Sequence, residues 1–155
     1  MRKLLIIIIL LLPSLSNAQL NKYIWQSSAA QFVAGAADGA NQAYLFHYSN
    51  SGKFEKWNIA PNSEAWKNKW AKDSAGNVIV GKERFWLSSR SLVFLTDFHH
   101  SSRFVENRAT EASLLIYAIG HGVKRKRWYW YLADTAILFT VRSIGFYSTY
   151  NIVFK

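Results

Sequence analysis

The sequence has no cysteine, and only 9 acidic residues against 19 Lys and Arg in a chain of 155 residues. Without cysteine, stability cannot come from disulfide bonds, and a soft-metal site would lack thiolate ligands. The shortage of acidic residues leaves a formal net charge of +10 at pH 7. The charge favours anionic partners, although solubility alone would account for it equally well.

Complete catalytic motifs are also absent. The chain has no G-x-S-x-G, no H-E-x-x-H, no calcium loop and no glycine-rich phosphate-binding motif. We therefore predict no cofactor and no metal site, and a non-enzymatic protein is the favoured interpretation.

No uncharged apolar run after residue 18 reaches the roughly 20 residues that a spanning helix needs. Asp38 divides 24–48, His121 and Lys124 end 112–123, and Asp134 and Arg142 interrupt 128–154. These breaks favour a compact domain outside the bilayer. A compact integral membrane protein with buried ion pairs stays open as an alternative.

The first 18 residues have the pattern of a secretory signal peptide. A positive start, Arg2-Lys3, precedes the apolar run 4–12, and Ser16-Asn17-Ala18 supplies small residues for cleavage after Ala18. The predicted mature chain, 19–155, is long enough for a single domain with its own core. Export to the periplasm or cell envelope disfavours nucleic acid as a partner. It favours anionic lipid head groups or an envelope protein; the oligomeric state stays unknown.

The residue pattern predicts a mainly α fold, a compact bundle of about four helices over 27–48, 88–104, 106–122 and 128–147. Gly35, Gly39 and Ala43 form a small-residue ridge on the first helix, which would let another helix approach closely. A long structured loop should join the first two helices. It contains a short helix over 63–70 that places Trp66 and Trp70 on one face, a turn at 73–77 and an extended piece at 78–80.

The segment TDFHHSSRF, 96–104, holds two of the four histidines. On a helix, Asp97 and His100 share a face, so Asp97 could orient His100 as a general base requires. His99 shares a face with Arg103 and is expected to point toward that residue or solvent. An Asp–His hydrogen bond that bridges helices is the favoured interpretation. Metal ligation would need further ligands from His47, His121, Asp38 or Asp134.

A second polar cluster surrounds Asp38, with Asn41 and Gln42 one helical turn away. An aspartate among alanines must be paired or protonated if it is buried. Its expected partner is Arg90, Arg142 or a histidine. A small hydrolase or metal-assisted enzyme using Asp38, Asp97 and His100 is the alternative function.

The third candidate is a basic segment followed at once by aromatic residues. Lys124, Arg125, Lys126 and Arg127 precede Trp128, Tyr129, Trp130 and Tyr131. At an anionic membrane surface, basic side chains are attracted to head groups while aromatic rings lie at head-group level. A basic turn followed by buried aromatic residues is the alternative. The predicted surface-binding residues are Lys124, Arg125, Lys126, Arg127, Trp128 and Trp130.

The succession A-G-A-A-D-G, H-Y-S, W-K-N-K-W, R-F-W-L-S-S and T-D-F-H-H resembles a family of small, exported, uncharacterised bacterial proteins. The likeness covers about 32–100. It implies no activity or cofactor, only that the matching positions act together. These positions are Gly35, Asp38, Gly39, His47, Tyr48, Trp66, Trp70, Arg84, Phe85, Ser88, Ser89, Asp97 and His100.

Overall fold

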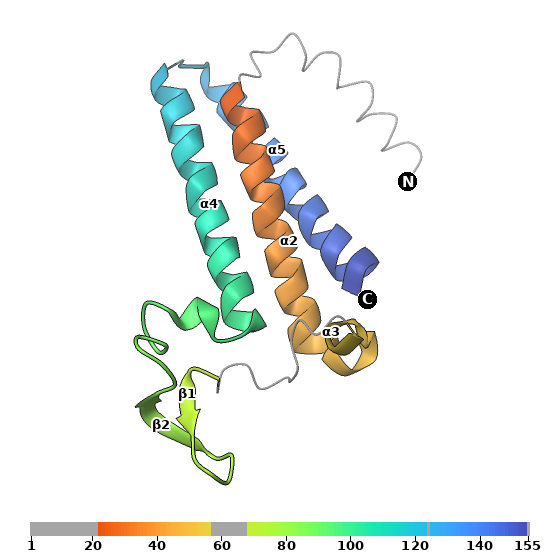
Figure 1. Ribbon diagram of the computed structural model, residues 1–155. Helices are drawn as coiled ribbons and strands as arrows, with labels where there is room; N and C mark the ends of the chain where they lie inside the picture. The colour runs from red at the N-terminus through yellow and green to blue at the C-terminus, as the bar shows by residue number, and fades with distance from the viewer. Residues whose placement is uncertain (1–21, 57–67, 124, 155) are drawn as a thin grey trace.

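The computed structural model describes residues 22–56, 68–123 and 125–154. The predicted signal peptide, Trp66 and Lys124 lie outside the described residues. Three long helices lie side by side: α2 (Lys22–Ser51), α4 (Phe98–Val123) and α5 (Trp128–Tyr147) (Figure 1). The chain continues past α5 into the π-helical segment η3 (Ser148–Phe154). The prediction of a mainly α fold is confirmed.

The prediction of four helices is not matched. In the described part of the chain, 98–123 form one continuous helix, and 88–97 are turns that include the short 3₁₀ helix η2 (Val93–Leu95). Asp97 explains where α4 begins, because its carboxylate accepts the backbone N–H of His100 at 3.0 Å, as an N-cap side chain does. The apolar run 92–95 therefore precedes the helix instead of forming its core.

The connection between α2 and α4 matches the predicted long structured loop only in part, and its residues 57–67 lie outside the described ranges. It contains the short helix α3 (Lys53–Lys56) and a two-stranded antiparallel sheet of β1 (Trp70–Lys72) and β2 (Val78–Glu83). The Asp73 carboxylate accepts the backbone N–H groups of Ala75 and Asn77, which forms the predicted turn. Trp70 is a strand residue opposite Glu83, so the predicted helix over 63–70 is wrong at its last residue.

The small-residue ridge of α2 is the contact surface for α5. A Cβ atom on Gly35 would overlap the Arg142 carbonyl oxygen, and one on Gly39 would lie 2.5 Å from the Phe146 carbonyl oxygen. Gly145 of α5 lies in the same way against the backbone of Phe32. The two backbones therefore touch, and this geometry leaves no space between them for large side chains.

The helices have an unusual distribution of polarity. The residues buried within the bundle are largely small or polar, namely Ser27, Ser28, Gln31, Ala34, Asn41, Ser102, Glu106, Ser113 and Asp134. An aromatic cluster at one end of α2, formed by Tyr44, Phe54 and Phe154, supplies the apolar core there. Many large apolar side chains of all three helices are exposed instead.

None of the described helices combines the length and the apolarity that crossing a bilayer requires.

The close contact of α2 and α5 can be tested with Gly35→Ala. We expect a loss of about 1–3 kcal/mol in the free energy of unfolding, because the added methyl group forces two backbones apart. Gly122→Ala is the matched control, since a Cβ there meets nothing within 4 Å. Urea unfolding, monitored by circular dichroism, measures the free energy of unfolding of both variants. Equal stability of the two variants would contradict the packing described here.

Candidate functional site

Asp97 and His100 form the pair that the spacing predicts. Nδ1 of His100 lies 2.8 Å from Oδ2 of Asp97, and the Thr96 hydroxyl donates to the same carboxylate oxygen at 2.9 Å. Burial alone would raise the pKa of Asp97. The hydrogen bonds from His100 and Thr96 outweigh burial and hold this pKa below its usual range. The arrangement fixes the orientation of one imidazole ring at the start of α4.

His99 corrects a prediction, because it faces α2 and not Arg103 or solvent. Its Nδ1 lies 2.7 Å from Oδ1 of the buried Asn41, which also accepts the Ser102 hydroxyl at 3.2 Å. Burial, followed by the nearby charge of His100, lowers the pKa of His99. His99 therefore joins α4 to α2 through a hydrogen bond, and its neutral form is favoured.

Asp38 pairs with Arg142, one of its three predicted partners. The closest approach is 3.8 Å, while the same guanidinium lies 2.7 Å from Glu106 and donates to Thr110 at 3.0 Å. Arg103 holds the other Glu106 oxygen at 2.8 Å. This cluster, which we call the arginine clasp, joins all three long helices through the buried Glu106.

The three proposed catalytic residues belong to two separate clusters. Asp97 and His100 are together, but in the described part of the chain no hydrogen bond or ion pair joins Asp38 to either of them. The Asp38 carboxylate is engaged by Arg142. The Asp97–His100 pair thus holds one histidine in a fixed orientation. Asp38 instead takes part in a charge cluster that bridges the helices.

The basic-aromatic segment divides into outward and inward residues. Arg125, Arg127 and Trp128 are exposed, with Trp128 at 73% of its full accessibility, whereas Trp130 is half-buried. Lys126 corrects the prediction of a surface-binding residue, because its ammonium group lies 2.7 Å from Asp134 and its side chain is only 7% exposed. Asp134 draws Lys126 into the bundle and leaves its two neighbouring arginines outside.

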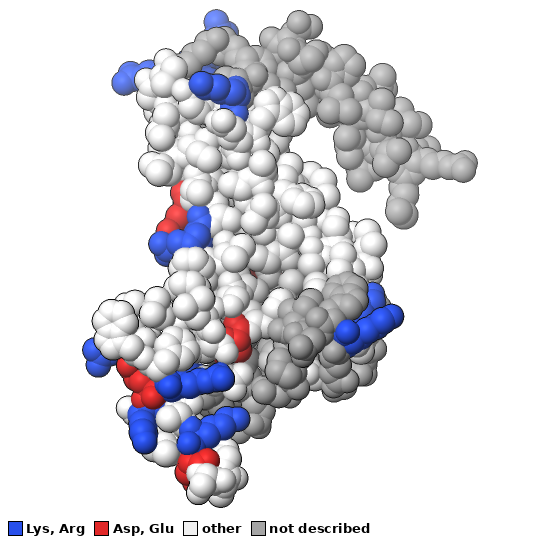
Figure 2. Space-filling model, viewed as in Figure 1, with Lys and Arg blue, Asp and Glu red and all other residues white. Residues whose placement is uncertain are grey.

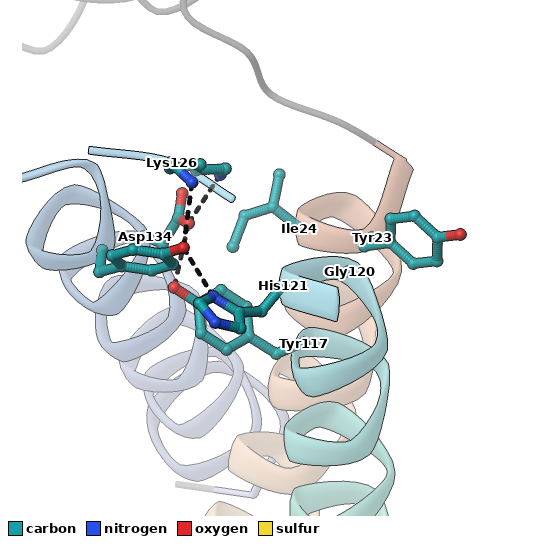
Figure 3. A pocket seen from close by; sticks show the side chains of 8 residues that line it. Tyr23, Ile24, Tyr117, Gly120, His121, Lys126 and Asp134 are labelled. Atoms are coloured by element: carbon teal, nitrogen blue, oxygen red, sulfur yellow. Dashed lines mark hydrogen bonds and ion pairs between the residues drawn. The ribbon is translucent and has the colours of Figure 1, made fainter. Parts of the chain in front are cut away.

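A small cavity of about 10 Å³ lies beside this ion pair, which is near the lower limit for one water molecule. Figure 3 shows Tyr117 and His121 of α4, Lys126 of the connection and Asp134 of α5 converging there. Tyr117 donates to Asp134 at 3.1 Å. The Tyr131 hydroxyl is hydrogen-bonded to Nδ1 of His121 at 2.6 Å and accepts the Lys126 backbone N–H at 3.0 Å.

Tyr117 is the cavity residue whose pKa is clearly shifted by its surroundings. Burial, together with the charge of Asp134, raises the pKa of Tyr117, so its hydroxyl stays protonated and donates. Tyr117 and Lys126 therefore both donate hydrogen bonds to the Asp134 carboxylate. The cavity is too small for an organic substrate, and its lining residues serve to fix the connection between α4 and α5.

No group of three or more His, Asp or Glu side chains able to hold a metal ion occurs among the residues in the described ranges. The other two histidines are each bound to a tyrosine. His47 is bound to Tyr150 of η3, and His121 to Tyr131.

Glu106 and Ser113 are the polar residues that the sequence reasoning missed. Ser113 is fully buried and contacts the Ser27 hydroxyl at 2.7 Å. A signal was present, because polar and small residues recur on one face of α4 at helical spacing: Ser102, Glu106, Thr110, Ser113, Tyr117 and Gly120.

The ionised state of Asp97 can be tested with Asp97→Asn. A carboxyl group with a lowered pKa in the fold stabilises it above its unfolded pKa of about 3.9, and the contribution is lost as pH falls through the folded pKa. We therefore expect the variant to be less stable at neutral pH, with the difference vanishing below about pH 4. Thermal melts across this range measure the difference, and Glu111→Gln, on an exposed ion pair, is the control. A difference independent of pH would contradict a role for the charge.

The buried Lys126–Asp134 pair can be tested with Asp134→Asn. Removing one partner leaves an unpaired buried ammonium group, so we expect a loss of about 3–5 kcal/mol in the free energy of unfolding. The exposed Arg108–Glu111 pair provides the control, because Glu111→Gln should cost at most about 1 kcal/mol. Chemical unfolding compares the two variants. Similar small losses would show that Lys126 is not held inside.

Comparisons of the chain with protein-family models, curated proteins and solved structures find no match. Function is accordingly argued from the residues and their geometry.

Proposed function

We propose that this protein is a non-enzymatic component of the cell envelope that binds the surface of an anionic membrane. The binding element is the basic tip, which we define as Arg125, Arg127 and Trp128 at the connection of α4 and α5. The observation that carries the proposal is the outward position of these three side chains, beside a Lys126 that is held inside.

The basic tip matches the chemistry of a head-group layer. Each arginine near an anionic surface contributes about 1 kcal/mol of attraction. An indole ring is favoured at the boundary between head groups and acyl chains, where its apolar body and its N–H group are both accommodated. In water the ring is 73% exposed, so the protein gains little free energy from burying its apolar surface.

The surroundings of the basic tip are apolar. Val123 and Ile119 of α4 are exposed beside it, at 67% and 49%. Trp25 of α2 belongs to the same end of the bundle, because the Tyr23 side chain lies directly against Gly120 of α4. A lipid surface can contact all of these side chains together, since its acyl chains adapt to an irregular apolar outline.

The alternative hydrolase has one supporting observation, the oriented His100. Its proposed third residue, Asp38, is engaged in the arginine clasp, and the cavity beside Asp134 is too small for an organic substrate. Membrane binding uses the exposed residues directly and is therefore the function that we favour.

Cosedimentation with vesicles tests the proposal. We expect the purified protein to pellet with phosphatidylcholine vesicles containing phosphatidylglycerol, and to be released by high salt or by omission of the anionic lipid. Replacing both Arg125 and Arg127 with Gln should lower the partition coefficient about 30-fold, from about 1 kcal/mol per charge.

The matched control replaces Lys72 and Lys82 of the β1–β2 hairpin with Gln, which changes the net charge equally. If both double variants lose binding to the same extent, general charge and not the basic tip is responsible. Absence of binding by the unmodified protein at low salt would remove the proposed function. If the protein stays in the membrane fraction after alkaline carbonate extraction, the alternative of an integral membrane protein would be favoured instead.

A further inference from the structure

We propose that the lipid-contacting surface extends from the basic tip along the outward faces of α2 and α5, so that these two helices lie along the membrane. This proposal rests on the proposed function and assigns an orientation to it. The occupant of the apolar face is the boundary between head groups and acyl chains of an anionic membrane.

The first observation is the charge along these two helices. From Trp128 to Tyr147, only Asp134 and Arg142 are charged, and both are paired toward the bundle. In α2, Lys22 is charged at the first position of the helix, at the end that carries the basic tip, and Asp38 is paired with Arg142. The outward face of α5 is thus free of charge over 20 residues, about 30 Å of helix.

The second observation is what occupies that face. On α5 the exposed large side chains recur at helical spacing, from Trp128 and Leu132 to Phe139, which is 72% exposed. On α2, Trp25, Phe32 and Val33 are exposed in the same manner. The backbones of α2 and α5 touch at Gly35 and Gly145, and Phe32 of α2 lies at this contact.

The third observation is the contrast with α4 and the hairpin. The first half of α4 exposes Arg103, Arg108 and Glu111. The hairpin region exposes Lys72, Lys82, Arg84 and Arg90. Figure 2 shows charged groups at both ends of the molecule, on the α4 side and beside α3, with a broad uncharged area between them. Among the described residues, the outward face of α5, and that of α2 beyond Lys22, can enter an apolar layer without taking unpaired charges with them.

This orientation also agrees with the position of the basic tip. If the protein entered the membrane with its tip first, Arg125 and Arg127 would be carried into the acyl chains, where charged groups are strongly disfavoured. With α2 and α5 lying along the surface, the apolar face is buried by about 5–10 Å while the arginines stay among the head groups. The basic tip and the apolar face then bind simultaneously.

The absence of cysteine makes the orientation directly measurable, because each introduced cysteine is a unique labelling site. Phe32→Cys and Phe139→Cys carry an environment-sensitive fluorophore on the proposed face. Arg108→Cys on α4 and Lys82→Cys on the hairpin are the matched controls. With phosphatidylglycerol-containing vesicles, we expect a blue shift and quenching by brominated acyl chains at 32 and 139, and neither change at 108 and 82.

The outcomes separate this inference from the proposed function. If the protein sediments with vesicles but labels at 32 and 139 are not quenched, binding is confined to the basic tip and the orientation is wrong. Equal quenching at 32, 139 and 108 overturns it as well, because lipid would then surround the helices. A concentration-dependent blue shift at 32 and 139 without vesicles would assign the face to a second copy. Failure to sediment at all removes the proposed function and the orientation together.

Circular dichroism of each labelled variant verifies that the helices are retained.

Discussion

The direct contact between the backbones of α2 and α5 is the constraint on which the rest of this structure depends. Gly35 and Gly39 lie against carbonyl groups of α5, and Gly145 lies against α2. Helices this close cannot hold large side chains between them. The bundle interior is therefore filled by small residues, hydrogen-bonded hydroxyl groups and paired charges, and large apolar side chains occupy the outside.

Paired charges make such an interior tolerable. A buried ionised group costs several kcal/mol unless a partner and further hydrogen bonds compensate it. Glu106 meets this requirement with Arg142 and Arg103, and Asp134 meets it with Lys126 and Tyr117. Both clusters use charges from different parts of the chain, so they fix which helices are neighbours. They also remove these charges from the surface, which leaves α5 uncharged on its outer side.

How far the sequence predicts the structure differs from residue to residue. Three features follow from local spacing in the sequence. They are the bounds of α5, the turn at Asp73 and the Asp97–His100 pair, and the last two depend on residues within one hairpin or one helical turn. The start of α4 was misplaced, since an apolar run such as 92–95 has no unique secondary structure. The predicted direction of the His99 side chain is wrong because its partner, Asn41, is 58 positions away in the chain.

By itself, the sequence determined a mainly helical fold and a small-residue ridge on α2 that another helix could approach. It also determined that a basic segment is followed by aromatic residues. Only the tertiary structure decided that Arg142 is the partner of Asp38, and that Lys126 turns inward while Arg125 and Arg127 stay outside. The physical reason is that helical spacing specifies which residues share a face. Which face is covered, and by which charge, depends on how distant helices pack.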